Sequence, residues 1–253
     1  MSEAMSLYDA APSHSLQKTV VRNSPVQTPT GFVRSEYGVL LRKNWLDATF
    51  HFCKRGAYDT LLVDYLYHQY RPFTFVDIGA NQGLYSILAG QNAHCQQVVA
   101  FEPVASTFSL LKTNIAINQV EDIVQPIKAA VSLETGSSLI IKKPGHSGAA
   151  SLRKLPRWFR VTETIATIGP DMLQASIPAA SDLIIKVDVE GHEGVVFDAL
   201  ARSGVLSNAK AVFYEVNRRW SQEQALAAIL REYGFTDFVY TSSKSRCDVL
   251  ATR

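Results

Sequence analysis

The segment that most constrains the fold of this chain is residues 73–86, which read FTFVDIGANQGLYS. Its first four residues have the β-branched and aromatic character of a short buried strand. Asp77 ends this apolar run, Gly79 and Gly83 follow, and a helical apolar pattern begins at Leu84. The segment therefore predicts a strand, a tight glycine turn and the start of a helix. Backbone N–H groups at such a junction have no partner within the helix, so a ligand binds there readily.

The spacing of the glycines indicates the class of ligand. A dinucleotide-binding loop has the pattern G-x-G-x-x-G, in which glycine lets a diphosphate approach the backbone. Here the pattern is D-x-G-x-x-x-G, with the carboxylate of Asp77 at the strand tip. A carboxylate repels a diphosphate and attracts a cationic ligand. The loop therefore favours S-adenosylmethionine, which carries a sulfonium and an α-amino group; the alternative is that Asp77 only caps the helix.

A second strand, residues 98–101, ends at Glu102, because the following Pro103 cannot continue a strand ladder. Glu102 lies about twenty residues beyond the glycine loop, where α/β nucleotide sites place an acid on ribose hydroxyls. An ionised carboxylate at a fixed strand tip can accept both hydroxyl hydrogens. We therefore expect Glu102 to bind a ribose, the alternative being a solvated glutamate at a strand end.

Five strand–helix units followed by two final strands define the expected fold. Later strands are expected near residues 123–131, 183–189 and 211–216, with a closing β-hairpin formed by residues 235–241 and 247–252. This pattern predicts an α/β, doubly wound, Rossmann-like sheet of seven mostly parallel strands. The terminal β-hairpin is typical of the class I methyltransferase fold and distinguishes it from six-stranded dehydrogenases.

Three parts of the chain are distinguished by composition. Residues 1–35 form a proline-bearing N-terminal extension, an arm that we expect to be mobile or to mediate homo-oligomer contacts. We expect residues 36–72 to form an N-terminal helical cap and residues 73–253 to form the S-adenosylmethionine-binding domain. Within it, residues 137–142 predict a strand that leaves the nucleotide fold as part of a hairpin. Residues 143–170 predict an irregular basic and aromatic insert, either a substrate lid or a solvated face.

The overall charge and the cysteines limit the partners. The net charge is +2 and the pI about 8.4, too mild to indicate nucleic-acid or membrane binding. Three scattered cysteines form no C-x-x-C pair, which favours a reducing compartment. No signal peptide or membrane-spanning apolar run is evident, so we expect a cytoplasmic protein.

The fourth strand, residues 183–189, carries polar residues at its carboxyl end. Its nearly continuous apolar run suits a central parallel strand, which brings Asp188 and Glu190 to the sheet edge. His192 titrates near neutral pH and is a candidate general base, with Glu190 and Glu193 as rivals. The alternatives are that Glu193 stabilises a helix N-terminus and that His192 only packs or caps.

A magnesium site is an open alternative at the same edge. Asp188 or Glu190, together with Glu215 and Asn217 of the fifth strand tip, could supply oxygen ligands. Ligand binding and loop capping explain the same acidic strand tips, and we expect no metal.

Three segments together resemble the FkbM family of S-adenosylmethionine-dependent methyltransferases. They are residues 76–86 (VDIGANQGLYS), residues 101–103 (FEP) with Asn114 and Asn118, and residues 185–193 (IKVDVEGHE). The resemblance covers residues 55–250, and the third segment is the most specific to the family. It implies methyl transfer to a hydroxyl of a small molecule, typically a sugar or another natural product.

The resemblance also implies roles for individual residues. The expected cofactor-binding residues are Asp77, Gly79, Asn81, Gly83, Phe101, Glu102, Pro103 and Asp188. Asp188 and Glu190 are expected to face the reacting centre and, with His192, form the candidate catalytic set.

Two other hypotheses for the function remain. One is a nicotinamide-dependent oxidoreductase or epimerase, which the absent G-x-G-x-x-G weakens, and the other is a non-catalytic interaction module with the same fold.

Overall fold

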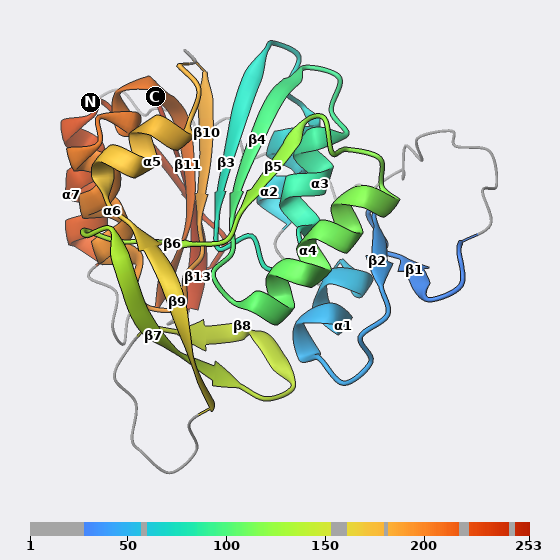
Figure 1. Cartoon of the computed structure of the whole chain (residues 1–253). Helices are drawn as coiled ribbons and strands as arrows, with labels where there is room; N and C mark the ends of the chain where they lie inside the picture. Colours follow the sequence, from blue (N-terminus) through green and yellow to red (C-terminus); the bar gives the residue numbers. More distant parts are fainter. Residues whose placement is uncertain (1–27, 57–59, 153–160, 180–181, 218–222, 243–245) are drawn as a thin grey trace.

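The central element of the structure is a seven-stranded sheet with the strand order β12-β13-β11-β10-β3-β4-β5. The structure is a computed structural model and describes residues 28–56, 60–152, 161–179, 182–217, 223–242 and 246–253 (Figure 1). The parallel strands are β3 (Phe73–Ile78), β4 (Cys95–Phe101), β5 (Val124–Ile127), β10 (Leu183–Val187) and β11 (Ala209–Asn217). β13 (Arg246–Thr252) runs antiparallel to β11 and to β12 (Asp237–Tyr240). The predicted doubly wound sheet with its terminal β-hairpin is confirmed.

Helices cover both faces of this sheet (Figure 1). One face packs against α2 (Thr60–Tyr67), α3 (Leu84–Gly90) and α4 (Ala105–Ile117), and the other against α5 (Pro170–Ser176), α6 (Glu193–Arg202) and α7 (Glu223–Glu232). A short 3-10 helix, η2 (Val205–Asn208), precedes β11. Successive side chains of a strand point to opposite faces. In β3, Phe73 and Phe75 therefore join the α3 layer, whereas Val76 and Ile78 join the α6 layer.

A second, four-stranded sheet with the order β6-β9-β7-β8 lies beyond one end of the central sheet (Figure 1). Its strands are β6 (Ala130–Val131), β7 (Gly136–Lys143), β8 (His146–Ser151) and β9 (Val161–Ile168). The strand expected at residues 137–142 is confirmed and forms a hairpin with β8. The expectation of an irregular insert at residues 143–170 is wrong for β8 and β9, because β8 pairs with β7 and β9 pairs with β7 over residues 161–167. The basic and aromatic residues 153–160 lie outside the described part of the chain.

The N-terminal part adds a small hairpin and one helix to the α3 side. The hairpin is formed by β1 (Phe32–Arg34) and β2 (Leu40–Arg42), and α1 (Ala48–Arg55) follows. Asp47 caps α1, because its carboxylate accepts a hydrogen bond from the backbone of Thr49. Residues 1–27 of the expected arm lie outside the described residues. In the part of the chain that the structure describes, no helix has the length and apolar character needed to cross a bilayer.

Candidate functional site

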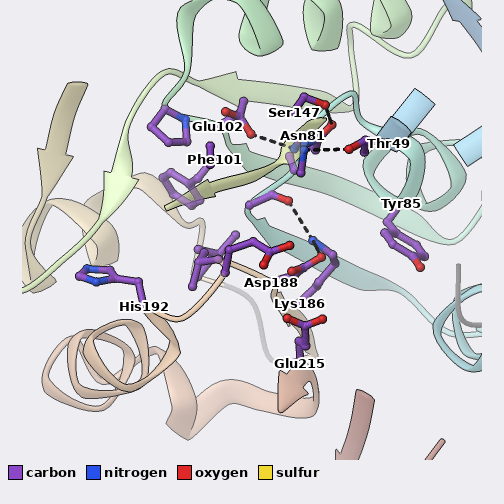
Figure 2. A pocket seen from close by; sticks show the side chains of 18 of the residues that line it. Thr49, Asn81, Tyr85, Phe101, Glu102, Ser147, Lys186, Asp188, His192 and Glu215 are labelled. Atoms are coloured by element: carbon purple, nitrogen blue, oxygen red, sulfur yellow. Dashed lines mark hydrogen bonds and ion pairs between the residues drawn. The ribbon is translucent and has the colours of Figure 1, made fainter. Parts of the chain in front are cut away.

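A cavity of about 410 Å³ lies at the carboxyl ends of β3, β4, β10 and β11, with residues of α1 and β8 in its walls. Of the residues expected from the sequence, Gly79, Asn81, Phe101, Glu102, Pro103, Asp188, Glu190 and His192 line it. Asp77 and Gly83 are not among its lining residues. In Figure 2, Glu102 and Asn81 lie toward one end of the pocket and Glu215 toward the other, with Asp188 and Lys186 between them. The polar residues of the cavity therefore form two separate groups, one around Glu102 and one around Glu215.

The two loop glycines serve different purposes. Gly79 has φ +85°, and a Cβ atom there would lie 1.9 Å from the carbonyl oxygen of Asp188. Only glycine lets β3 and β10 end side by side at the cavity. Gly83 also has a positive φ, but a Cβ there would meet the side chain of Leu111 at 2.5 Å. The structure corrects the expectation for Gly83: it lets α3 begin against α4 and does not line the cavity.

Asp77 is fully buried and is held by the protein itself. It is the register partner of Lys186 on the adjacent strand, and Lys186 Nζ donates to its Oδ1 at 3.0 Å. Ser86 Oγ of α3 donates to Asp77 Oδ2 at 2.6 Å. The expectation that Asp77 faces a cationic ligand is therefore corrected. Strand alternation turns its side chain toward α3, and the ammonium of Lys186 neutralises its charge.

Lys186 is buried, yet it lines the cavity. Its ammonium also donates to the carbonyl oxygen of Gly79 at 3.0 Å and lies 3.9 Å from Asp188 Oδ2. Burial alone lowers the pKa of Lys186, but the carboxylates of Asp77 and Asp188 outweigh it and raise this pKa above its ordinary value. Lys186 therefore stays charged and joins the glycine loop to the end of β10.

Glu102 has the position expected of it, at the end of β4 and in the cavity wall. Its Oε2 accepts the backbone N–H of Asn81 at 3.0 Å, and its Oε1 accepts that of Val104 at 2.9 Å. Only 5% of its surface is exposed. Burial raises the pKa of Glu102 to about 7, although the two backbone donors counteract this effect. Each oxygen keeps a lone pair for a further donor.

The opposite end of the cavity is acidic. Asp188, Glu190 and Glu215 offer carboxylate oxygens within 4.8 Å of one another. Arg246 donates through Nε to Glu215 and through Nη2 to Glu190 at 3.0 Å. Burial and Asp188 raise the pKa of Glu215 to about 8, and burial also raises the pKa of Glu190, while Arg246 opposes both shifts.

This arrangement bears on the magnesium alternative. Two of the three clustered carboxylates already contact the guanidinium of Arg246, which supplies positive charge at this point. Asn217, named in that alternative, is not among the cavity-lining residues. The site can thus balance much of its negative charge with the chain's own cations.

The candidate bases differ in their surroundings. Glu190 has φ +52°, which is strained for a residue with a side chain, and Ser151 Oγ donates to its carbonyl oxygen at 2.8 Å. His192 precedes α6, and its buried Nε2 has no hydrogen-bond partner in the described residues. Burial lowers the pKa of His192, so it is neutral at pH 7. In Figure 2 its ring lies apart from Asp188, Lys186 and Glu215.

Glu193 is buried in the first turn of α6 and accepts the backbone N–H of Gly191 at 2.9 Å. Glu193 does not line the cavity, so it is not placed to act as the base. Its position agrees with the alternative that it stabilises the N-terminus of α6.

Several cavity residues were not identified from the sequence. Lys186 carried a usable signal, because a lysine within the apolar run LIIKV must find a buried partner. Gln82 carried none, although it is 1% exposed and lines the cavity. Thr49 and Ser147 reach the site from segments distant in sequence, and Gly148 N donates to Thr49 Oγ1 at 2.8 Å. Their roles depend on the packing of β8 against α1.

The strand order, the reversed β13 and the cavity at the carboxyl ends of the parallel strands define the class: a Rossmann-like methyltransferase fold. The sequence profile described as "Methyltransferase FkbM domain" matches residues 77–236, more than half of the chain. The chain therefore belongs to the FkbM methyltransferase family, as the resemblance of its motifs indicated.

Two relatives illustrate this membership. The chain is 29% identical over 141 residues to the hexuronic acid methyltransferase AglP of Haloferax volcanii. The match covers 56% of this chain and 54% of that protein, so the chain spans about half the length of this relative. The crystal structure of an FkbM methyltransferase from Methylobacillus flagellatus is similar with a TM-score of 0.52 and 13% identity. That match covers 72% of this chain and 44% of the other, and it supports the fold.

Proposed function

We propose that this chain is an S-adenosylmethionine-dependent O-methyltransferase whose acceptor is a hydroxyl of a small molecule, in particular a sugar or related natural product. Family membership supports methyl transfer over the nicotinamide-dependent alternative. The name of the relative from Haloferax volcanii supports a sugar-derived acceptor. The observation that carries the proposal is Glu102, a buried carboxylate in the cavity wall with free lone pairs at the position of a ribose-binding acid.

The cavity residues fit the parts of S-adenosylmethionine. Glu102 would accept hydrogen bonds from the ribose hydroxyls. The apolar side chains of Phe101, Ala129 and Val131 line the cavity and would contact the adenine. Gly79 removes the side chain that would otherwise block the space beside Asp188, and its loop would hold the amino-acid portion. The ribose, the adenine and the amino-acid portion of the cofactor would therefore each contact residues of suitable chemistry.

The residues of the acidic end would serve the acceptor. When bound, S-adenosylmethionine supplies a methyl group that its sulfonium already activates. The protein then has to align the hydroxyl, exclude water and remove a proton. An alcohol is a weak nucleophile, and a general base contributes roughly a hundredfold or more.

We assign the base to Glu190. Its pKa is raised by burial toward the range in which a carboxylate is an effective base, it lines the cavity, and its strained backbone conformation is held by Ser151. His192 is the rival, because Nε2 of its neutral ring has no hydrogen-bond partner among the residues that the structure describes. The variant Glu190→Gln should lower kcat at least about a hundredfold, whereas His192→Gln should lower it only a few-fold. The reverse order would transfer the role to His192.

Calorimetric titration with S-adenosylhomocysteine tests the cofactor assignment. Wild-type protein should bind it, and Glu102→Ala should weaken binding at least tenfold, because the ribose hydroxyls lose a charged acceptor. Glu121→Ala, an exposed position before β5, is the matched control and should bind like wild type. Absence of wild-type binding, or equal binding by Glu102→Ala, contradicts the proposal.

The acceptor is tested separately with labelled S-adenosylmethionine and a panel of sugars, sugar acids and polyketide alcohols. Label should appear in an ether that survives mild alkaline treatment, as expected for methylation of a hydroxyl. Label only in an alkali-labile ester would show that a carboxylate is the acceptor and would contradict the O-methylation of hydroxyls proposed here.

A further inference from the structure

Gln82 lines the cavity and carries a buried hydrogen-bond acceptor that has no partner among the described residues. Its Nε2 donates to Asp47 Oδ2 and to Ser147 Oγ, both at 3.3 Å. Its Oε1 is buried, and within the described part of the chain no donor reaches it. Because buried carbonyl oxygens nearly always have a partner, this one indicates a site for a ligand donor. Nothing in the mechanism proposed above uses it.

The orientation of the Gln82 amide is fixed by its neighbour. Reversing the amide would bring Oε1 against the carboxylate of Asp47, so only the observed orientation is electrostatically favourable. Asp47 is itself held firmly, since its Oδ1 accepts the backbone N–H groups of Thr49 at 2.8 Å and Ser147 at 3.3 Å. Asn44 Nδ2 donates to its Oδ2. The position of this acceptor is therefore set by the fold.

The charge behind Gln82 selects the kind of donor. The carboxylate of Asp47 polarises the amide that donates to it, which makes the opposite oxygen a better acceptor for a cation. Its charge also reaches the lining residue Cys53: burial raises the pKa of this thiol to about 12, with Asp47 as the second cause. The sequence suggested that Asp77 attracts the cationic ligand, but the charge of Asp77 is neutralised by Lys186.

We propose that Gln82 binds the α-ammonium group of the cofactor and that Asp47 is the residue that positions its amide. This inference rests on the proposed function. The ammonium is the cationic hydrogen-bond donor of S-adenosylmethionine, and the same loop carries Asn81, whose backbone N–H binds Glu102 beside the expected ribose. The negative charge of Asp47 would thus favour the ammonium group through the neutral amide of Gln82.

Calorimetry with two ligands tests this role. S-adenosylhomocysteine carries the α-ammonium, and its analogue without the α-amino group keeps the adenosine and the carboxylate. The variant Gln82→Met should weaken binding of S-adenosylhomocysteine at least tenfold and of the analogue less than twofold. Gln96→Met, an exposed glutamine at the amino end of β4, is the control and should change neither affinity.

Asp47→Asn gives an independent measurement. Asparagine also caps helices well, so α1 should be retained, which thermal unfolding checks. An amide at position 47 can donate to Gln82, which lets the Gln82 amide reverse and put Nε2 where Oε1 now lies. We expect this variant to lose the preference for S-adenosylhomocysteine over the analogue at least fivefold.

The outcomes separate the two proposals. Equal weakening of both ligands by Gln82→Met would show a purely structural role and overturn the inference, as would unchanged binding. Equal wild-type affinity for both ligands would overturn it while leaving the cofactor assignment intact. Failure of wild-type protein to bind either ligand would overturn the proposed function and this inference together.

Discussion

The buried carboxyl of Glu102 should make the stability of the fold depend on pH in a defined direction. Burial raises its pKa from 4.5 to about 7 in the folded protein. Between these values the folded protein keeps a proton that the unfolded chain has released. The free energy of unfolding therefore falls as pH rises through this window and becomes level above it. At about 1.4 kcal/mol for each pKa unit, the full effect is about 3 kcal/mol.

Urea unfolding of wild type and Glu102→Gln at several pH values between 5 and 8 measures this effect. The glutamine does not titrate, so the wild-type stability minus that of the variant should fall by about 2–3 kcal/mol across the range. Glu215, whose pKa is also raised, is present in both proteins and cancels in the difference. Glu121→Gln controls for the loss of one exposed carboxylate. A difference that stays constant with pH would refute the reasoning for Glu102.

The same geometry gives three further expectations. The affinity for S-adenosylhomocysteine should rise from pH 5 to pH 8 in wild type but not in Glu102→Gln, because the ionised carboxylate is the better acceptor; calorimetry checks this. Lys186→Met should lower the free energy of unfolding in urea by about 3–5 kcal/mol, since it leaves the buried carboxylate of Asp77 without its cation, and the added change Asp77→Asn should restore much of this loss. Gly79→Ala should lower the melting temperature and the affinity for S-adenosylhomocysteine together, because its Cβ would collide with Asp188; an unchanged melting temperature would contradict this.

The parts of the fold that follow from local pattern could be predicted from the sequence. The apolar runs of β3 and β10 and the proline after Glu102 fix strand ends within a residue or two, and the carboxyl ends of parallel strands meet at one edge. The position of Glu102 therefore followed from the sequence alone. β8 and β9 did not, because their stability comes from pairing with β7 and the alternation of their residues is weak.

The error over Asp77 has a similar physical origin. The sequence places this residue near a strand end, but its environment depends on which face it points to and on its register with β10. Its partner Lys186 lies 109 residues away along the chain. Gln82 is a comparable case: its Oε1 has no partner among the described residues, and this becomes evident only when Asp47 and Ser147 are placed beside its Nε2. Local sequence indicates where polar groups gather and does not indicate how they pair.

A crystal structure with S-adenosylhomocysteine bound measures the arrangement directly. The ribose hydroxyl oxygens should lie about 2.5–3.0 Å from the carboxylate oxygens of Glu102, with the homocysteine portion along the loop that carries Gly79. A nucleoside seated elsewhere, or one whose ribose makes no contact with Glu102, would contradict the assignment of this cavity.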